Sequence, residues 1–388
     1  MAFSTSKEHR IAKTDLQLDQ ILKVMNQLLE HYDHYDLTVD ILSAWFFYQQ
    51  RWFNDAYFDC TSTLRDSNGS QDCKPDFTIQ FPFSDYALIG EVKASLSVGS
   101  DSLEDLRKQV QSRVARRYSF PCSPDGTGLR EPEKQDLLVI VPGSRAAAVR
   151  TAFAQNPPIP SDGQHVCLCA FGDEDQHGRT LVFTRHPLEN GRDRLRDAFL
   201  AEENRISRYL DRGGIRIPLR KFEMYRDRII TNSDGVLSNL GLLLKLLGVA
   251  EELYGPASGS RLRTDKLVPN AIEFTLPALL SKLRGRGFFC AVSRSEVINV
   301  FSLLVASRQS FFSFDSSTLE VTYHVPRRAR YGEYRKEQVL QQLPKRRRQG
   351  LVPVFAFHLA RGILLREQRE LDANRRTGRI GQLSLFGP

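Results

Sequence analysis

Two carboxylates and an ammonium group lie close together in the first quarter of the chain. Asp76 is followed, after fourteen intervening residues, by the tripeptide Glu91-Val92-Lys93. Carboxylate oxygens are the ligands that hard divalent cations prefer, and a cation held by two of them polarises a phosphodiester and lowers the pKa of its bound water. These residue types therefore suit metal-assisted hydrolysis of a phosphate ester.

Two strands within residues 74–95 are expected to bring these groups to one edge of a sheet. Large apolar residues alternate with smaller or polar ones in the first strand, at Phe77, Ile79, Phe81 and Phe83. Ser84-Asp85 supplies a turn into the second strand, which begins at Tyr86. Side chains at i and i+2 of a strand share a face. Glu91 and Lys93 are therefore expected to project together, while Val92 points into the core.

Pro75-Asp76 and Glu91-Val92-Lys93 together resemble the signature of the PD-(D/E)xK, or restriction-endonuclease-like, nucleases. The resemblance implies that Asp76, Glu91 and the carbonyl of Val92 hold Mg²⁺ or Mn²⁺. It also implies that Lys93 orients or activates the attacking water. The alternative is that an acid, a second acid and a lysine fall on exposed strand ends by accident, because the pattern is a loose one.

Helices are expected on both sides of these strands. Apolar residues recur at helical spacing over residues 15–32, and a second helix is expected over residues 38–52. In the resembled nucleases, a helix before the sheet often adds another acidic group. Asp40 is the first candidate for this acid and metal ligand, and Glu30 is the second. The alternative for either residue is an ordinary solvated carboxylate.

A basic helix is expected over residues 102–118, after a polar break rich in glycine and serine. In many of the resembled nucleases a Gln or Lys on this helix lies beside the metal, and Gln109 matches that role. Arg113 and Arg117 are the candidates for contact with DNA. A solvated basic face is the alternative. Residues 120–134 are rich in Pro, Gly and charge and are expected to form a loop.

The remaining sequence up to residue 188 predicts a mixed α/β fold, and residues 1–188 are expected to form the nuclease domain. Strands are expected over residues 136–142, 165–171 and 180–184, with a helix over residues 145–154. A long charged helix over residues 192–211 would end at Gly213-Gly214. No complete phosphate-binding or dinucleotide-binding glycine motif occurs, so the usual nucleotide sites are not supported.

Composition and charge point to a globular protein with a nucleic-acid partner. The 388 residues are 41% hydrophobic and 26% charged, and residues 1–100 hold 8 basic against 14 acidic side chains. Residues 326–388 hold 15 basic against 5 acidic side chains, and such a polycation gains affinity for phosphates by releasing counterions. The first ten residues are polar, no membrane span is visible, and six scattered cysteines suit a reducing cytoplasm.

The second half predicts a helical connector, residues 189–260, followed by a module that resembles a winged helix, residues 261–326. Its pattern is a short helix from Leu276, a capped helix opening at Ser293, and a β-hairpin. Arg294, Ser295 and Asn299 would then lie at the start of the recognition helix, where base and phosphate contacts are made. A packing or dimerisation module is the alternative.

Residues 327–388 combine basic runs, a helix expected over residues 354–372, and a short terminal motif. The densest basic run, Lys345, Arg346, Arg347 and Arg348, favours phosphate contact. Gln382-Leu383-Ser384-Leu385-Phe386 closely resembles the peptide by which bacterial replication and repair proteins bind the DNA polymerase sliding clamp. That resemblance assigns clamp contacts to Gln382, Leu383, Leu385 and Phe386. Packing of these residues on the last helix is the alternative.

These expectations combine into one functional hypothesis and one alternative. The leading hypothesis is a bacterial, metal-dependent DNA endonuclease of the cytoplasm, associated with the nucleoid and recruited by the sliding clamp. DNA repair, mobile-element processing and antiviral defence against phage are all compatible with it. The alternative is a non-cleaving DNA- and clamp-binding adaptor with a degenerate nuclease fold. A homodimer or a partner subunit is compatible with either.

Overall fold

The computed structural model describes most of the chain apart from its two ends and several connecting segments. The described residues are 18–52, 56–60, 63–66, 73–81, 85–94, 96, 100–121, 128–158, 164–174, 179–188, 195, 206–226, 229–230, 239–254, 271–285, 289–290, 294–306, 312–324 and 352–376. The chain divides into two compact units. Unit 1 comprises Met1–Asp33, Ser233–Lys282 and Val292–Pro388, and unit 2 comprises His34–Asn232 and Leu283–Ala291.

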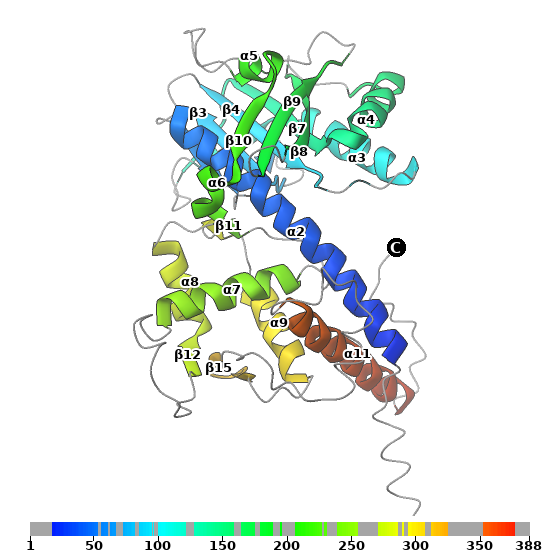
Figure 1. The fold of residues 1–388 in the computed structure, drawn as a ribbon, viewed down its shortest axis with the longest axis vertical. Coiled ribbons are helices and arrows are strands. Elements are labelled where there is room, and N and C mark those ends of the chain that lie inside the picture. Colours follow the sequence, from blue (N-terminus) through cyan, green and yellow to red (C-terminus); the bar gives the residue numbers. More distant parts are fainter. Residues whose placement is uncertain are drawn as a thin grey trace, which may run out of the picture. The chain divides into compact units, whose positions relative to one another are not determined.

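Unit 2 is built on a seven-stranded mixed sheet with the order β1-β3-β4-β7-β8-β9-β10 (Figure 1). The strands are β1 (Tyr57–Asp59), β3 (Phe77–Phe81), β4 (Tyr86–Val92), β7 (Lys134–Pro142), β8 (Val166–Glu174), β9 (Thr180–His186) and β10 (Ile215–Pro218). β4, β7 and β8 run parallel, and the other neighbouring pairs run antiparallel. The carboxyl ends of β4, β7 and β8 therefore meet at one edge of the sheet.

Helices cover both faces of this sheet. The part of α2 (Leu18–Trp52) that belongs to unit 2 shares a hydrophobic core with α5 (Ile206–Asp211) and α6 (Leu219–Arg226) on one face. On the opposite face, α3 (Ser100–Val114) and α4 (Gly143–Gln155) enclose a second core (Figure 1). The two cores take alternate residues of β4, as the two-residue period of a strand requires. The mixed α/β architecture predicted from the sequence is confirmed at this level.

α2 is one continuous helix of 35 residues, and this corrects the prediction of two helices separated near residues 33–37. The sequence there, His31 to Asp36, reads HYDHYD and lacks an apolar stripe. It contains neither glycine nor proline, however, so nothing in the backbone stops the helix. The unit boundary falls inside α2, between Asp33 and His34.

The first strands of the sheet are held by an aromatic stack. The ring of Phe77 on β3 stacks on Trp45 of α2 and on Phe58 of β1, with centroid distances of 6.0 and 5.5 Å. Phe77 lies opposite Gly90 in the antiparallel register, and its ring fills the space above that glycine. A Cβ at Gly90 would lie 2.1 Å from the ring, so the close approach requires a glycine beside Glu91.

Short strands replace part of the loop expected over residues 120–134. β2 (Arg65–Asp66), β5 (Tyr118–Pro121) and β6 (Leu129–Arg130) form a small antiparallel sheet. A second small sheet pairs β11 (Ile229–Ile230) with β13 (Phe289–Cys290) in parallel. Of the long helix expected over residues 192–211, residues 206–211 form α5. Gly213 and Gly214, which both have positive φ, follow its end. β10 follows and extends the main sheet past residue 188.

Unit 1 contains four further helices and a three-stranded antiparallel sheet with the order β12-β15-β14. In chain order its elements are α7 (Asn239–Tyr254), β12 (Ala271–Thr275), α8 (Leu276–Gly285, as far as Lys282 in this unit), α9 (Arg294–Ala306), β14 (Phe312–Asp315), β15 (Glu320–His324) and α11 (Val352–Arg376). The expected short helix, second helix and hairpin are confirmed. β12, which pairs with β15, was not predicted.

α9 and α11 pack closely within unit 1. The backbone of Gly362 on α11 approaches Leu303 so tightly that a Cβ would lie 2.1 Å from the Leu303 carbonyl oxygen. On α9, Phe301 stacks on Phe312 of the hairpin with a centroid distance of 5.1 Å. α9 therefore contributes to the core of the unit.

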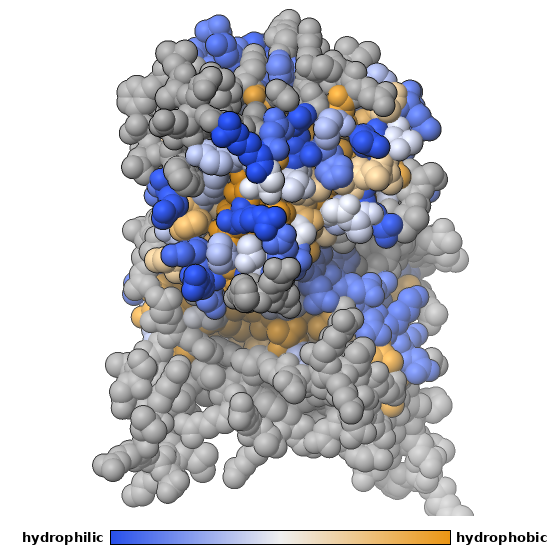
Figure 2. Space-filling view, turned by 45° about the horizontal axis from the view of Figure 1, so that its top comes forward, coloured by the Kyte–Doolittle hydropathy of each residue, from blue (hydrophilic) through white to orange (hydrophobic). Residues whose placement is uncertain are grey.

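On the face drawn in Figure 2, much of the described surface is hydrophilic, with smaller apolar areas between the polar residues. Within the part of the chain that the structure describes, every helix is too short or too polar to cross a membrane.

Candidate active site

Glu91 lies near the carboxyl end of β4, on the face that α3 covers. Its alternation partners Ala87 and Ile89 belong to the core beneath α3 and α4, whereas Val92 belongs to the opposite core. The Glu91 side chain is only 2% exposed. A carboxylate so deeply buried needs partners for its oxygens, because burial without them is costly.

Asp76 meets the same strand end from β3. Its backbone N–H donates to the carbonyl of Gly90 at 3.1 Å, and its Oδ2 accepts a hydrogen bond of 2.6 Å from the N–H of Val92. The carboxylate therefore takes the place of a backbone acceptor just before β3 begins. Because the N–H and C=O of one strand residue point the same way, the carbonyl of Val92 is also directed toward the β3 side.

Lys93 follows directly and continues the parallel ladder with β7. Its N–H donates to the carbonyl of Ile140 at 2.8 Å. Its side chain is half-buried, and its positive charge is close enough to lower the pKa of Glu91. The structure thus brings Asp76, Glu91 and Lys93 together at one strand end, as the sequence predicted.

The pKa of Glu91 is raised from its ordinary value of 4.5 to about 7. Burial is the largest cause, and the negative charge of Asp76 is the second. The positive charges of Arg113 and Lys93 act in the opposite direction. Two carboxylates that oppose each other's ionisation in this way would gain from a shared cation.

α3 supplies two partners to Glu91. Gln109 Nε2 donates to Glu91 Oε2 at 2.8 Å, and Arg113 Nε donates to Glu91 Oε1 at 2.8 Å. Gln109 and Arg113 are four residues apart and therefore lie on the same face of the helix. Arg113 also donates to the carbonyl of Lys74 at 3.1 Å. The family resemblance assigned Gln109 a place beside the metal, and the structure hydrogen-bonds Gln109 to Glu91. Arg113 was predicted to contact DNA, and its ion pair with Glu91 was not predicted.

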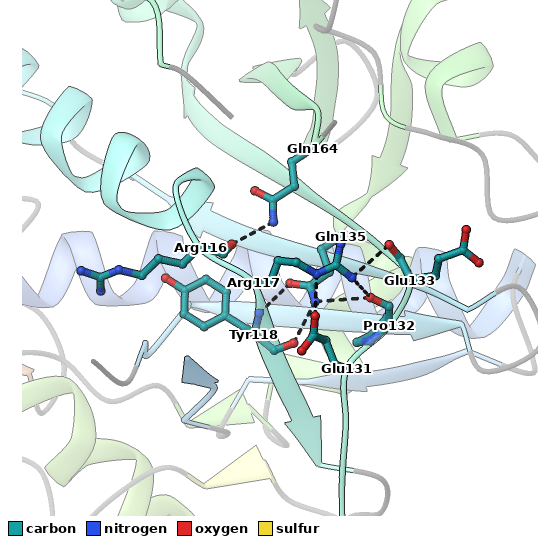
Figure 3. Close-up of polar contacts among 8 residues, drawn as sticks. All are labelled: Arg116, Arg117, Tyr118, Glu131, Pro132, Glu133, Gln135 and Gln164. Carbon is teal, nitrogen blue, oxygen red and sulfur yellow. Dashed lines mark hydrogen bonds and ion pairs between the residues drawn. The ribbon is translucent and has the colours of Figure 1, made fainter. Parts of the chain in front are cut away.

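The chain just after α3 is fastened by polar side chains, shown in Figure 3. Gln135, at the start of β7, accepts from the N–H of Tyr118 at 2.9 Å and donates to its carbonyl at 2.8 Å. Gln164 donates to the carbonyl of Arg116 at 2.9 Å (Figure 3). Both glutamines are buried. They fix the residues that follow Arg113.

Arg117 also holds this part of the chain in place. Its guanidinium donates to Glu131 at 2.5 Å and to the carbonyls of Pro132 and Glu133 at 2.6 and 3.1 Å (Figure 3). The sequence predicted a DNA contact for Arg117. The structure instead gives its guanidinium three partners within the protein, in the segment that leads into β7.

Asp40, the predicted helix-borne acid, lies fully buried on α2 and pairs with two arginines. Arg179 binds its Oδ2, and Arg226 Nε lies 2.6 Å from its Oδ1. Burial raises the pKa of Asp40, and the charges of Arg226 and Arg179 lower it. Each oxygen of this carboxylate is therefore paired with an arginine. Glu30, the second candidate, is exposed on the part of α2 that belongs to unit 1.

The donor set fits a hard divalent cation. Among the described residues, no group of three or more His, Cys, Asp and Glu side chains is placed to hold a metal ion. Mg²⁺ is usually held by one or two carboxylates together with waters and substrate phosphates, so a two-carboxylate site suits it. Asp76 and Glu91, with the carbonyl of Val92, are the residues that would hold it.

The remaining predicted site residues lie in unit 1. Asn299 Oδ1 accepts a hydrogen bond of 2.6 Å from Arg366 of α11, and Ser295 is exposed near the start of α9. The side chain of Arg294 lies outside the described set. So do all residues of the basic run and of the clamp-like peptide: Lys345, Arg346, Arg347, Arg348, Gln382, Leu383, Leu385 and Phe386.

Comparison with known proteins found no matching family model, no matching curated protein and no matching solved structure.

Proposed function

We propose that the chain is a metal-dependent DNA endonuclease that hydrolyses phosphodiester bonds at the carboxyl end of β4. The observation that carries the proposal is the convergence of Asp76, Glu91 and Lys93 at this strand end, with Gln109 hydrogen-bonded to Glu91 at 2.8 Å. Two acids, a lysine and an amide from three separate segments meet there. If the sequence pattern were accidental, nothing would require α3 to supply a hydrogen-bond donor to the carboxylate of Glu91.

Each residue has a distinct part in the proposed reaction. Asp76, Glu91 and the carbonyl of Val92 hold Mg²⁺ or Mn²⁺, which when bound polarises the phosphodiester and lowers the pKa of a bound water. Lys93 would orient or activate the attacking water. Gln109 orients Glu91 through its amide, and the hydrogen bond from the Val92 N–H fixes Asp76.

The topology around the site supports a restriction-endonuclease-like core. A helix, α2, precedes three antiparallel strands, β1, β3 and β4, and a crossover through α3 leads to the parallel strand β7. The acids lie on the second and third of these strands, and the amide lies on the crossover helix. The site is therefore built on regular elements, which hold catalytic groups more firmly than loops do.

The order of elements in unit 1 supports a winged-helix module. A helix, a strand, two helices and a hairpin follow one another, and the first strand pairs with the last. Arg294 and Ser295 at the start of α9 are the proposed DNA contacts, because Asn299 is engaged by Arg366. The basic run from Lys345 to Arg348 would add phosphate contacts.

The proposed recruitment to the sliding clamp rests on the terminal sequence, Gln382 to Phe386. A tether of this kind raises the local concentration of the nuclease at its DNA. Deletion of these five residues should abolish co-migration with a bacterial clamp and leave cleavage of naked DNA nearly unchanged. Equal clamp binding by both forms would contradict this part of the proposal.

A second candidate function is a DNA-binding adaptor that does not cleave. One observation favours it: both oxygens of Glu91 already have protein partners, and the carboxylate is buried. A site that has lost its metal permanently could keep such contacts.

Cleavage of plasmid DNA separates the two functions. The purified chain should nick or linearise plasmid with Mg²⁺ or Mn²⁺ and not with EDTA. Asp76→Ala and Lys93→Ala should abolish cleavage, and Lys134→Ala, an exposed lysine at the opposite end of the sheet, should not. Cleavage that survives both site substitutions would contradict the site. No cleavage of any DNA form would favour the adaptor.

A further inference from the structure

Arg113 joins the two chain segments that carry the acids of the site. Its Nε lies 2.8 Å from Glu91 Oε1, and its terminal nitrogen donates to the carbonyl of Lys74 at 3.1 Å. Lys74 is two residues before Asp76. The Arg113 side chain is 15% exposed, so most of this contact is shielded from water. One guanidinium therefore links the β3 entrance to the end of β4.

The two acids need such a link because their charges repel in a poorly hydrated place. A buried charge is tolerated when a partner of opposite sign compensates it. The guanidinium suits this task because it is planar, permanently charged and able to donate to several acceptors at once. An arginine guanidinium stays protonated in proteins, so Arg113 keeps its positive charge.

The backbone that follows Arg113 is also held in place. The residues that follow it are held by the buried amides of Gln135 and Gln164 and by the contacts of Arg117 (Figure 3). None of these contacts uses the carboxylates of the site. The guanidinium is therefore positioned from α3 and does not depend on the metal for its place.

We propose that Arg113 is an internal counter-cation, a positioning residue that keeps Asp76 and Glu91 assembled in the metal-free chain. It shares Glu91 with the divalent cation once the cation binds. This inference rests on the proposed function in one respect, since it takes the two acids to be the metal ligands. Its electrostatic part concerns the metal-free chain and can be tested without metal.

The experiment measures the thermal unfolding midpoint of a set of variants in EDTA and in excess Mg²⁺. The set is the unchanged chain, Arg113→Gln, Arg113→Lys, Asp76→Asn, and Arg113→Gln combined with Asp76→Asn. Arg107→Gln is the matched control, because Arg107 is also an α3 arginine with an acidic partner, Glu104, but lies away from the site. Asparagine keeps an oxygen that can accept from the N–H of Val92.

In EDTA, Arg113→Gln should lower the midpoint by roughly 3–6 °C, since it removes a positive charge that compensates the two acids. Adding Asp76→Asn should recover most of that loss, because one of the repelling charges is gone. Arg113→Lys should recover part of it, and Arg107→Gln should change nothing. If Arg113→Gln does not fold, folding of the double variant supports the proposal, and failure of both contradicts it. A loss that Asp76→Asn does not relieve would also overturn the proposal, because Arg113 would then act through packing alone.

The Mg²⁺ measurements test the proposed metal site separately. Mg²⁺ should raise the midpoint of the Arg113→Gln variant more than that of the unchanged chain. If no protein in the set responds to Mg²⁺, the metal site is wrong, while the EDTA measurements still decide the role of Arg113.

Discussion

The carboxylate of Asp76 accepts a hydrogen bond of 2.6 Å from the N–H of Val92. It therefore stabilises the end of β4, where it is also proposed to bind the metal. One Asp76 oxygen thus has a structural partner. The same carboxylate lies close enough to Glu91 to raise that residue's pKa. Structural and chemical roles of Asp76 should therefore be separable by substitution.

Asp76→Asn keeps the acceptor for the Val92 N–H and removes the charge, whereas Asp76→Ala removes both. Both variants should lose cleavage by at least about 100-fold, because a neutral side chain holds Mg²⁺ poorly. Asp76→Ala should be less stable than Asp76→Asn by about 1 kcal/mol, the usual value of one hydrogen bond. Urea unfolding and plasmid cleavage measure the two effects. Equal stability of the two variants would remove the structural role of Asp76.

Gly90→Ala should destabilise unit 2, because the new methyl group would lie 2.1 Å from the Phe77 ring. The ring is confined by Trp45 and Phe58, so the expected loss is about 2–3 kcal/mol. Gly172→Ala is the matched control, since no atom lies within 4 Å of a Cβ at that position. Denaturant unfolding of both variants tests this, and a neutral Gly90→Ala would show that the stack yields readily.

The raised pKa of Glu91, about 7 against an ordinary 4.5, predicts a pH dependence of stability. The folded chain keeps the Glu91 proton where the unfolded chain has lost it, so stability from this group falls as pH rises from about 4.5 to about 7 and is level above that. Glu91→Gln lacks this titration. The unfolding free energy of the unchanged chain minus that of Glu91→Gln should therefore decrease over this range. A difference that stays constant with pH would contradict the raised pKa.

The same proton competes with a metal for Glu91. The apparent affinity for Mg²⁺ should accordingly increase between about pH 6 and about pH 8, because the ligand must be ionised to bind. Calorimetric titration at several pH values measures this, and affinity that is independent of pH would argue against Glu91 as a ligand.

Substitution of Arg117 shows whether this residue stabilises the fold or contacts DNA. Arg117→Gln should lower stability, because Glu131 and the carbonyls of Pro132 and Glu133 lose their donor. It should leave the salt dependence of DNA binding unchanged, whereas loss of a phosphate contact would reduce the slope of log K against log salt by about 1. A reduced slope would restore the DNA contact that the sequence predicted.

The arrangement at the end of β4 could be predicted because the alternation of side chains along a strand shows which of them share a face. Alternation along β4 places Glu91 and Val92 on opposite sides, and the structure agrees. The helix that forms α3 was also predicted, and the family resemblance assigned Gln109 to the site. The ion pair between Glu91 and Arg113 was not predicted, because the sequence does not show where on a sheet a helix packs. The helix side chains that meet the sheet therefore cannot be identified.

Other contacts and strands that were not predicted have similar causes. Burial of Asp40 between Arg179 and Arg226 depends on partners 139 and 186 residues away, which a helical pattern cannot show. The strands β10 and β12 are short and carry only a few alternating residues, so neither stood out from its surroundings. Asn299 has the position expected of a recognition residue, but α11 supplies it with Arg366 from the end of the chain.

The most direct test of the central claim is anomalous diffraction from crystals of the chain soaked in Mn²⁺. The account predicts one anomalous peak about 2.0–2.3 Å from carboxylate oxygens of both Asp76 and Glu91, near the carbonyl of Val92, and no such peak in crystals of Asp76→Ala. Full Mn²⁺ soaking with no peak between these two carboxylates would contradict it.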